Sequence, residues 1–238
     1  MKRRRSVSMT WAALPIVVSV CAPVRAEETP SSASRPPPPL TQKPAALPPS
    51  SGGGSGKRVH DGFFLQLSLG AVYLHESWSP SAGGAGATYD GWGTSFEASV
   101  GKSVRPGLIV GGRWRFAAVI DPNESYLGTT TAARNTARLL DVVGAFLDYY
   151  PNPRRGLHVG ATVALLAATN VDAEYHAYET SWGPALSAHV GYEIFFSSHW
   201  SVGALAELSA YRYSTTEAGA SSVSDGLLPT LAVAFTFN

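Results

Sequence analysis

The chain has 238 residues, of which 15% are charged, 11% are aromatic and one is a cysteine. Soluble domains usually carry about 25% charged residues, so the composition argues against an ordinary soluble domain, and a single cysteine cannot form an internal disulfide. The formal net charge is +1, but five of the 18 basic residues lie in residues 1–26, which contain no acidic residue. The rest of the chain therefore has 13 basic and 17 acidic residues, and it shows no basic patch of the kind that binds nucleic acid.

The N-terminal segment, residues 1–26, predicts a secretory signal peptide. Lys2 to Arg5 form a positive region, Trp11 to Cys21 is an apolar run, and Val24-Arg25-Ala26 is a suitable cleavage site. A membrane anchor is the alternative interpretation, but the apolar run is shorter than the ~20 residues that span a bilayer. Cys21 is an alternative site for a lipid anchor.

The next segment, residues 27–57, is dominated by Pro, Ser, Gly and Ala and has no hydrophobic periodicity. Such a composition predicts a disordered linker, with an extended proline-rich part and a flexible joint at residues 50–56. A tether that touches the cell wall or a partner is the alternative.

The remainder, residues 58–238, contains eight stretches in which large apolar residues alternate with small or polar ones. These stretches are residues 61–75, 91–104, 107–120, 136–150, 156–167, 180–196, 199–213 and 227–238. A period of two predicts β-strands that each have one apolar face. In the last stretch Leu231, Val233 and Phe235 lie on the apolar face, and Thr230 and Ala232 lie on the other.

The connections between these stretches alternate in length. The short ones are Arg105-Pro106, residues 151–155 and Ser197-Ser198, and the long ones are residues 76–90, 121–135, 168–179 and 214–224. Short periplasmic turns and long outer loops are typical of an outer-membrane barrel. The pattern therefore predicts an all-β fold, a transmembrane eight-stranded antiparallel up-and-down β-barrel, with both ends of the barrel and the linker in the periplasm.

The two faces of the strands decide between a membrane barrel and a soluble one. A soluble, lipocalin-like barrel would turn its large apolar side chains inward. Here the polar face is rich in Gly, Ala and Ser, which suits a narrow interior, and the apolar face is too continuous for a surface in water. Aromatic residues near the predicted strand ends, which suggest two interfacial girdles, are Tyr73, Trp78, Trp92, Tyr149, Tyr150, Tyr192, Phe196, Trp200, Tyr211, Tyr213, Phe235 and Phe237.

Charged and histidine side chains also fall on the predicted inward face. They are Glu97, Arg113, Arg115, Asp148, His158, His189, Glu193 and Glu207. Unpaired charges away from water are costly, so we expect these side chains to pair across the interior as a structural network. A small gated pore through the same network is the alternative.

Enzymatic chemistry has little support in the sequence. His189 and Glu193 are four residues apart on one strand face, so they do not match a helical zinc motif. A lipid-modifying barrel would need a nucleophile and a base near the outer surface, and His75, Glu76 and Ser77 are interpreted there as the solvated start of a loop. We predict no catalytic residue, cofactor or metal. Aromatic residues of the outer loops, such as Trp78 and Tyr89, leave open a surface ligand.

Residues 61–238 resemble the small OmpA-type and OmpX-type outer-membrane β-barrel families. The resemblance rests on DGFFLQLSLGAVYL at residues 61–74, on LDYYPNP at residues 147–153, on the glycine-rich inward faces and on the aromatic-ended last strand. It implies residence in the outer membrane of a Gram-negative bacterium, among lipid and lipopolysaccharide. It also implies that Leu227–Asn238 is read by the outer-membrane assembly machinery, although Asn238 follows the final aromatic residue.

Overall fold

The computed structural model describes residues 62–132, 136–171, 177–217 and 220–238. The predicted signal peptide at residues 1–26 and linker at residues 27–57 lie outside the described residues. The described part contains ten strands and no helix that is long and apolar enough to cross a membrane. The strands are β1 (Phe63–Pro80), β2 (Ala87–Arg105), β3 (Leu108–Ile120), β4 (Asn123–Tyr126), β5 (Thr129–Ala132), β6 (Ala137–Tyr149), β7 (Gly156–Val171), β8 (Ala177–Phe195), β9 (Trp200–Glu217) and β10 (Ala220–Phe237).

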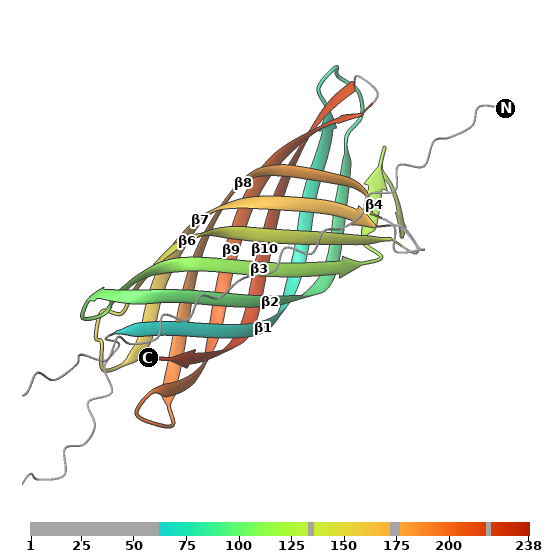
Figure 1. Ribbon diagram of the computed structural model, residues 1–238. Helices are drawn as coiled ribbons and strands as arrows, with labels where there is room; N and C mark the ends of the chain where they lie inside the picture. The colour runs from blue at the N-terminus through green and yellow to red at the C-terminus, as the bar shows by residue number, and fades with distance from the viewer. Residues whose placement is uncertain (1–61, 133–135, 172–176, 218–219) are drawn as a thin grey trace, which may run out of the picture. The chain divides into compact units, whose positions relative to one another are not determined.

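Eight of these strands close into an antiparallel barrel (Figure 1). Each pairs with its neighbours in chain order, and β1 completes the ring by pairing with both β2 and β10. Pairs such as Leu65↔Phe237 and Leu65↔Val100 set the register at this closure. Closure removes the free sheet edges, so every barrel strand can satisfy its backbone hydrogen bonds without water. The predicted eight-stranded up-and-down barrel is confirmed.

The inward and outward faces follow the predicted alternation. On the outside, Leu69 is 66% exposed and Leu231 is 69% exposed, whereas on the inside Gln66 and Glu97 are 1% and 2% exposed. A surface with large apolar side chains and an interior with polar ones is the reverse of a soluble barrel. The structure therefore has the face pattern of a membrane barrel.

The outer loops are shorter than the sequence predicted, because the strands continue beyond the apolar stretches. Residues 214–224 were expected to form a loop, yet β9 reaches Glu217 and β10 begins at Ala220, with Ser222 paired to Thr215. Likewise, Trp78 at the end of β1 pairs with Ala87 of β2. Outside the membrane the outward face meets water, so the strands no longer need apolar residues there and the alternation disappears from the sequence.

The second predicted outer loop, residues 121–135, contains a hairpin of its own. Strands β4 and β5 pair with each other, and β4 also pairs with β2 through positions such as Tyr89↔Glu124. This hairpin extends the wall at the end of the barrel opposite the C-terminus (Figure 1). That end, which also carries the long β1–β2 and β9–β10 hairpins, is here called the outer end.

Four of the aromatic residues assigned to the girdles face inward instead. Tyr150, Tyr211 and Tyr213 are buried, and Trp78 lies on the inward face of β1. Trp92 and Tyr192 do face outward, at 72% and 57% exposure. The inward tyrosines were misassigned because each contributes a hydroxyl to a buried polar group, which sequence position alone does not reveal.

Candidate functional site

The eight charged and histidine residues predicted for the interior are all buried inside the barrel. They come from six strands, β2, β3, β6, β7, β8 and β9, and none is more than 5% exposed. The structure sorts them into a central ring and a lower group nearer the short turns. Their proposed role, structural or conducting, remains a prediction.

The central ring consists of two arginines and two glutamates. Arg115 Nη2 lies 2.8 Å from Glu97 Oε2 and also contacts Glu207 Oε1. Arg113 closes the ring, with Nε 3.2 Å from Glu97 Oε1 and Nη1 3.3 Å from Glu207 Oε2. Because each glutamate forms an ion pair with both guanidiniums, the ring joins β2 and β3 to β9 across the interior and balances its own charge.

The lower group contains two carboxylates and two histidines. His189 Nε2 lies 2.5 Å from Asp148 Oδ1, and His158 Nδ1 lies 3.2 Å from the carbonyl oxygen of Gly156. Within the described part of the chain, Glu193 has no arginine partner and instead accepts hydrogen bonds from four uncharged donors. These donors are Tyr150 Oη at 3.1 Å, Ser201 Oγ at 2.5 Å, Thr236 Oγ1 at 3.0 Å and Gln66 Nε2 at 3.4 Å.

An apolar layer crosses the barrel on the outer side of the central ring. Seven of the eight barrel strands contribute to it, and its fully buried members include Val72, Leu74, Leu140, Leu166 and Leu228. A second cluster, Phe64, Ile109, Phe146 and Tyr150, lies at the other end beneath the lower group. Packed apolar side chains exclude water and ions, and these two clusters occupy the interior on either side of the charged residues.

A third charged group lies beyond the apolar layer, and the sequence prediction missed it. Glu76 was interpreted as part of a solvated loop start, but it is completely buried and forms an ion pair with Arg138. Tyr211 Oη donates to Glu76 Oε2 at 2.8 Å, and Tyr213 Oη donates to Glu76 Oε1 at 2.7 Å. The neighbouring His75 points outward, where its Nδ1 lies 2.6 Å from Asp90 Oδ1. The period of two along β1 places Glu76 on the inward face, and this pattern was the sequence signal that could have identified it.

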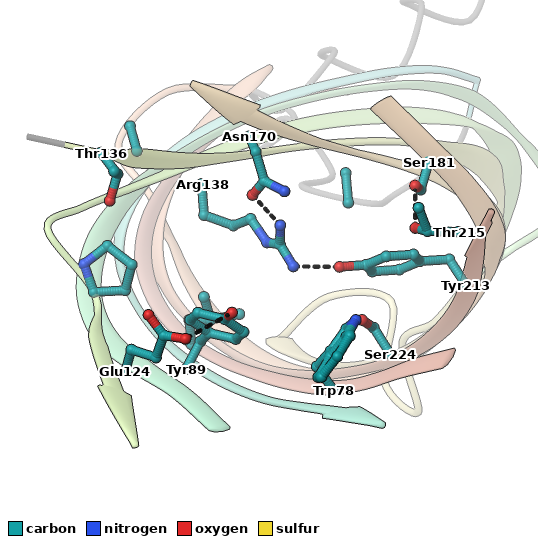
Figure 2. Close-up of a pocket in the computed structure, with 14 residues that line it drawn as sticks. Trp78, Tyr89, Glu124, Thr136, Arg138, Asn170, Ser181, Tyr213, Thr215 and Ser224 are labelled. Atoms are coloured by element: carbon teal, nitrogen blue, oxygen red, sulfur yellow. Dashed lines mark hydrogen bonds between the residues drawn. The ribbon is translucent and has the colours of Figure 1, made fainter. Parts of the chain in front are cut away.

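Arg138 of this buried ion pair lines an outward pocket of about 200 Å³ (Figure 2). Arg138 reaches into the pocket between Asn170 and Tyr213, with Tyr89 and Trp78 on the facing wall. The guanidinium carbon lies 5.8 Å from the centre of the Tyr89 ring. Hydroxyl groups complete the lining, contributed by Thr136, Ser181, Thr215 and Ser224.

The polar groups of the pocket are already oriented by one another. Ser181 Oγ and Thr215 Oγ1 are 2.6 Å apart, and Tyr89 Oη donates to Glu124 Oε1 at 3.3 Å. Burial, followed by the nearby Glu124 carboxylate, raises the pKa of Tyr89 to about 12, so this phenol stays protonated. Among the residues that the structure describes, the lining offers hydroxyl, amide, carboxylate and guanidinium groups and includes no histidine, cysteine or lysine.

Together, the closed barrel, the lipid-compatible exterior and the polar, filled interior define the protein as a transmembrane β-barrel of the outer-membrane type. No protein-family model and no curated protein sequence matches the chain.

Several solved structures are similar in fold. The Neisserial surface protein A (NspA) shares 16% identity, with 74% of this chain and 97% of that chain covered and a TM-score of 0.48. The outer membrane protein OprG from Pseudomonas aeruginosa shares 13% identity over 76% and 99% of the two chains, with a TM-score of 0.47. Ail of Yersinia pestis, in complex with the heparin analogue sucrose octasulfate, shares 11% identity over 74% and 99%, with a TM-score of 0.38.

Proposed function

We propose that this protein is a non-enzymatic outer-membrane barrel whose filled interior anchors a small binding site at the cell surface. The observation that carries this proposal is the outward pocket above the Glu76–Arg138 ion pair, beneath which the apolar layer closes the barrel. Its biological role is then surface interaction, as in adhesion or envelope integrity. As part of the same proposal, residues 27–57 form a periplasmic linker, and Leu227–Asn238 serves as the assembly signal.

The pocket chemistry favours an uncharged ligand rich in hydroxyl groups. Trp78, Tyr89 and Tyr213 provide flat aromatic surfaces, and hydroxyl and amide groups lie between them. Among the described lining residues Arg138 carries the one guanidinium, and Glu76 already neutralises it, so these residues offer a strongly anionic ligand no unpaired cation. A pocket of about 200 Å³ has room for one small group. We therefore propose a sugar residue of a surface glycan as the ligand class.

Replacing Trp78 with Ala should weaken glycan binding about five- to thirtyfold, because the ligand loses an aromatic wall whose burial and stacking are worth on the order of 1–2 kcal/mol. The measurement is binding of the refolded barrel to a glycan array, followed by titration of each bound glycan. Trp92→Ala is the matched control, since Trp92 faces outward and is 72% exposed. Absence of glycan binding by the wild-type protein, or equal loss in both variants, contradicts the ligand assignment.

The same architecture predicts that the barrel does not conduct ions. The apolar layer, from Val72 and Leu74 to Leu140 and Leu228, lies between the central ring and the outward pocket. Wild-type protein in planar bilayers should therefore show no steady current above that of protein-free bilayers. A steady current that changes in an Arg113→Met variant would support the gated pore instead. Heat-dependent mobility of outer-membrane fractions on unboiled gels verifies that the tested barrel is folded.

A further inference from the structure

Three potential metal ligands meet in the lower group of the interior. Asp148, His158 and His189 come from the adjacent strands β6, β7 and β8, and their ligand atoms all lie within 4.8 Å of one another. Each of these side chains is at most 5% exposed. Two imidazoles and a carboxylate form a donor set that suits Zn²⁺ and related divalent transition-metal ions.

Two of the ligand atoms lack partners in the part of the chain that the structure describes. Asp148 Oδ2 and His158 Nε2 are buried and make no hydrogen bond there. His158 Nδ1 is 3.2 Å from the Gly156 carbonyl oxygen, which can only accept, so Nδ1 carries the proton and Nε2 presents its lone pair. A metal-binding histidine typically has this arrangement, with its second nitrogen bound to a backbone carbonyl.

The charges around the cluster also favour a cation. The eight buried residues of the central ring and the lower group include four carboxylates but two guanidiniums, so with neutral histidines they carry a net charge of −2. The central ring balances its own charge, and Glu193 has four hydrogen-bond donors. Asp148, by contrast, has a single close donor among the described residues, His189 Nε2. Uncompensated buried charge is costly, and one divalent ion offsets both negative charges.

Two glycines provide the space in which these side chains meet. Gly160 pairs with Asp148 on one side and His189 on the other, and Gly191 pairs with His158. A Cβ at Gly160 would overlap Asp148 Oδ1, and one at Gly191 would overlap His158 Nε2. Asp148 and His189 therefore lie over Gly160, and His158 lies over Gly191, so that the three side chains approach one another.

We propose that Asp148, His158 and His189 form a binding site for one divalent transition-metal ion of the zinc type. The ion binds Asp148 Oδ2, His158 Nε2 and His189 Nε2, which requires the cluster to close slightly, because atoms bound to one Zn²⁺ lie within about 4.4 Å of one another. His189 moves its proton to Nδ1 and gives up its 3.2 Å contact with Arg113 Nη1. Arg113 Nη1 keeps Thr162 and Glu207 as acceptors. Because the apolar clusters close both sides, the ion enters as the barrel folds.

The test uses untagged protein in which His60, His75, His176 and His199 are replaced by Gln, so that His158 and His189 are the remaining histidines. The barrel is refolded from urea into detergent micelles with Zn²⁺ or Co²⁺, separated from unbound metal, and analysed for bound ion. We expect about one ion per folded barrel, with the visible absorption of four-coordinate Co²⁺. His158→Gln and Asp148→Asn should each weaken binding by about 10–100-fold, at least the loss seen for outer-shell partners.

X-ray absorption of the zinc-loaded parent protein counts the histidine ligands of the ion. This measurement tests the site even if neither His158→Gln nor Asp148→Asn folds. Two histidine ligands support the site. A folded barrel that retains no ion overturns the proposal, as does zinc without histidine ligands. Equal retention by the parent protein and by folded His158→Gln also overturns it. None of these outcomes depends on glycan binding, so the metal site and the proposed surface role are tested separately.

Discussion

Replacing Arg115 with Met is expected to lower the free energy of unfolding by about 3–5 kcal/mol, the usual cost of removing one partner from a buried ion pair. Arg115 is 3% exposed and bridges Glu97 and Glu207, while its Nη1 also donates to Ser209 Oγ at 2.9 Å. Met reproduces the aliphatic stem of Arg but not its guanidinium, so the effect reports the lost ion pairs together with the space that the guanidinium filled. The measurement is reversible urea unfolding in micelles, followed by tryptophan fluorescence and gel mobility.

The same substitution at Arg212 is the matched control. Arg212 Nε lies 2.7 Å from Asp225 Oδ1, but the two side chains are 67% and 53% exposed. Exposed pairs contribute about 0–1 kcal/mol, so Arg212→Met should change the stability little. Adding Glu207→Gln to Arg115→Met should recover part of the loss, because one carboxylate then needs no cation. Equal costs at the buried and exposed arginines would contradict the assigned importance of the central ring.

The barrel could be predicted from the sequence because the membrane imposes a strict period of two on each strand. An outward residue such as Leu231 must be apolar and an inward one such as Thr230 small or polar, so the eight strands and their faces were readable. Beyond the membrane, both faces of a strand tolerate polar residues. The strand residues at 214–217 and 220–224 therefore appeared as a loop, and the β4–β5 hairpin was not recognised.

The interior was predictable as a list of residues but not as an arrangement. Alternation placed Glu97, Arg115 and Asp148 inside. Which of these charges meet depends on how the barrel closes, with β1 pairing to β10. Glu76 was missed because its neighbours resemble a loop, whereas in the structure the long β1–β2 hairpin continues through it and brings it to Arg138, which lines the outward pocket. The proposed metal ligands are 10 and 31 residues apart along the chain and meet because β6, β7 and β8 are adjacent.

Replacing Gly160 with Ala is expected to destabilise the barrel by about 1–3 kcal/mol, the usual cost of overpacking a filled core. The added Cβ would lie 2.5 Å from His189 Nε2 and would overlap Asp148 Oδ1. Both side chains are buried, so they cannot swing into solvent, and the 2.5 Å contact between them would be lost. The methyl group thus costs packing energy and a buried hydrogen bond at once.

Gly112→Ala separates this effect from the general consequence of adding a methyl group to a strand. Gly112 faces outward on β3, and a Cβ there would meet no atom within 4 Å. Because glycine is less favourable than alanine by about 0.5–1 kcal/mol inside a strand, this variant should be neutral or slightly more stable. Opposite signs at the two positions, measured by urea unfolding, would show that Gly160 is required by its neighbours Asp148 and His189. Equal effects would instead mean that these side chains repack freely and that the lower group is not a fixed arrangement.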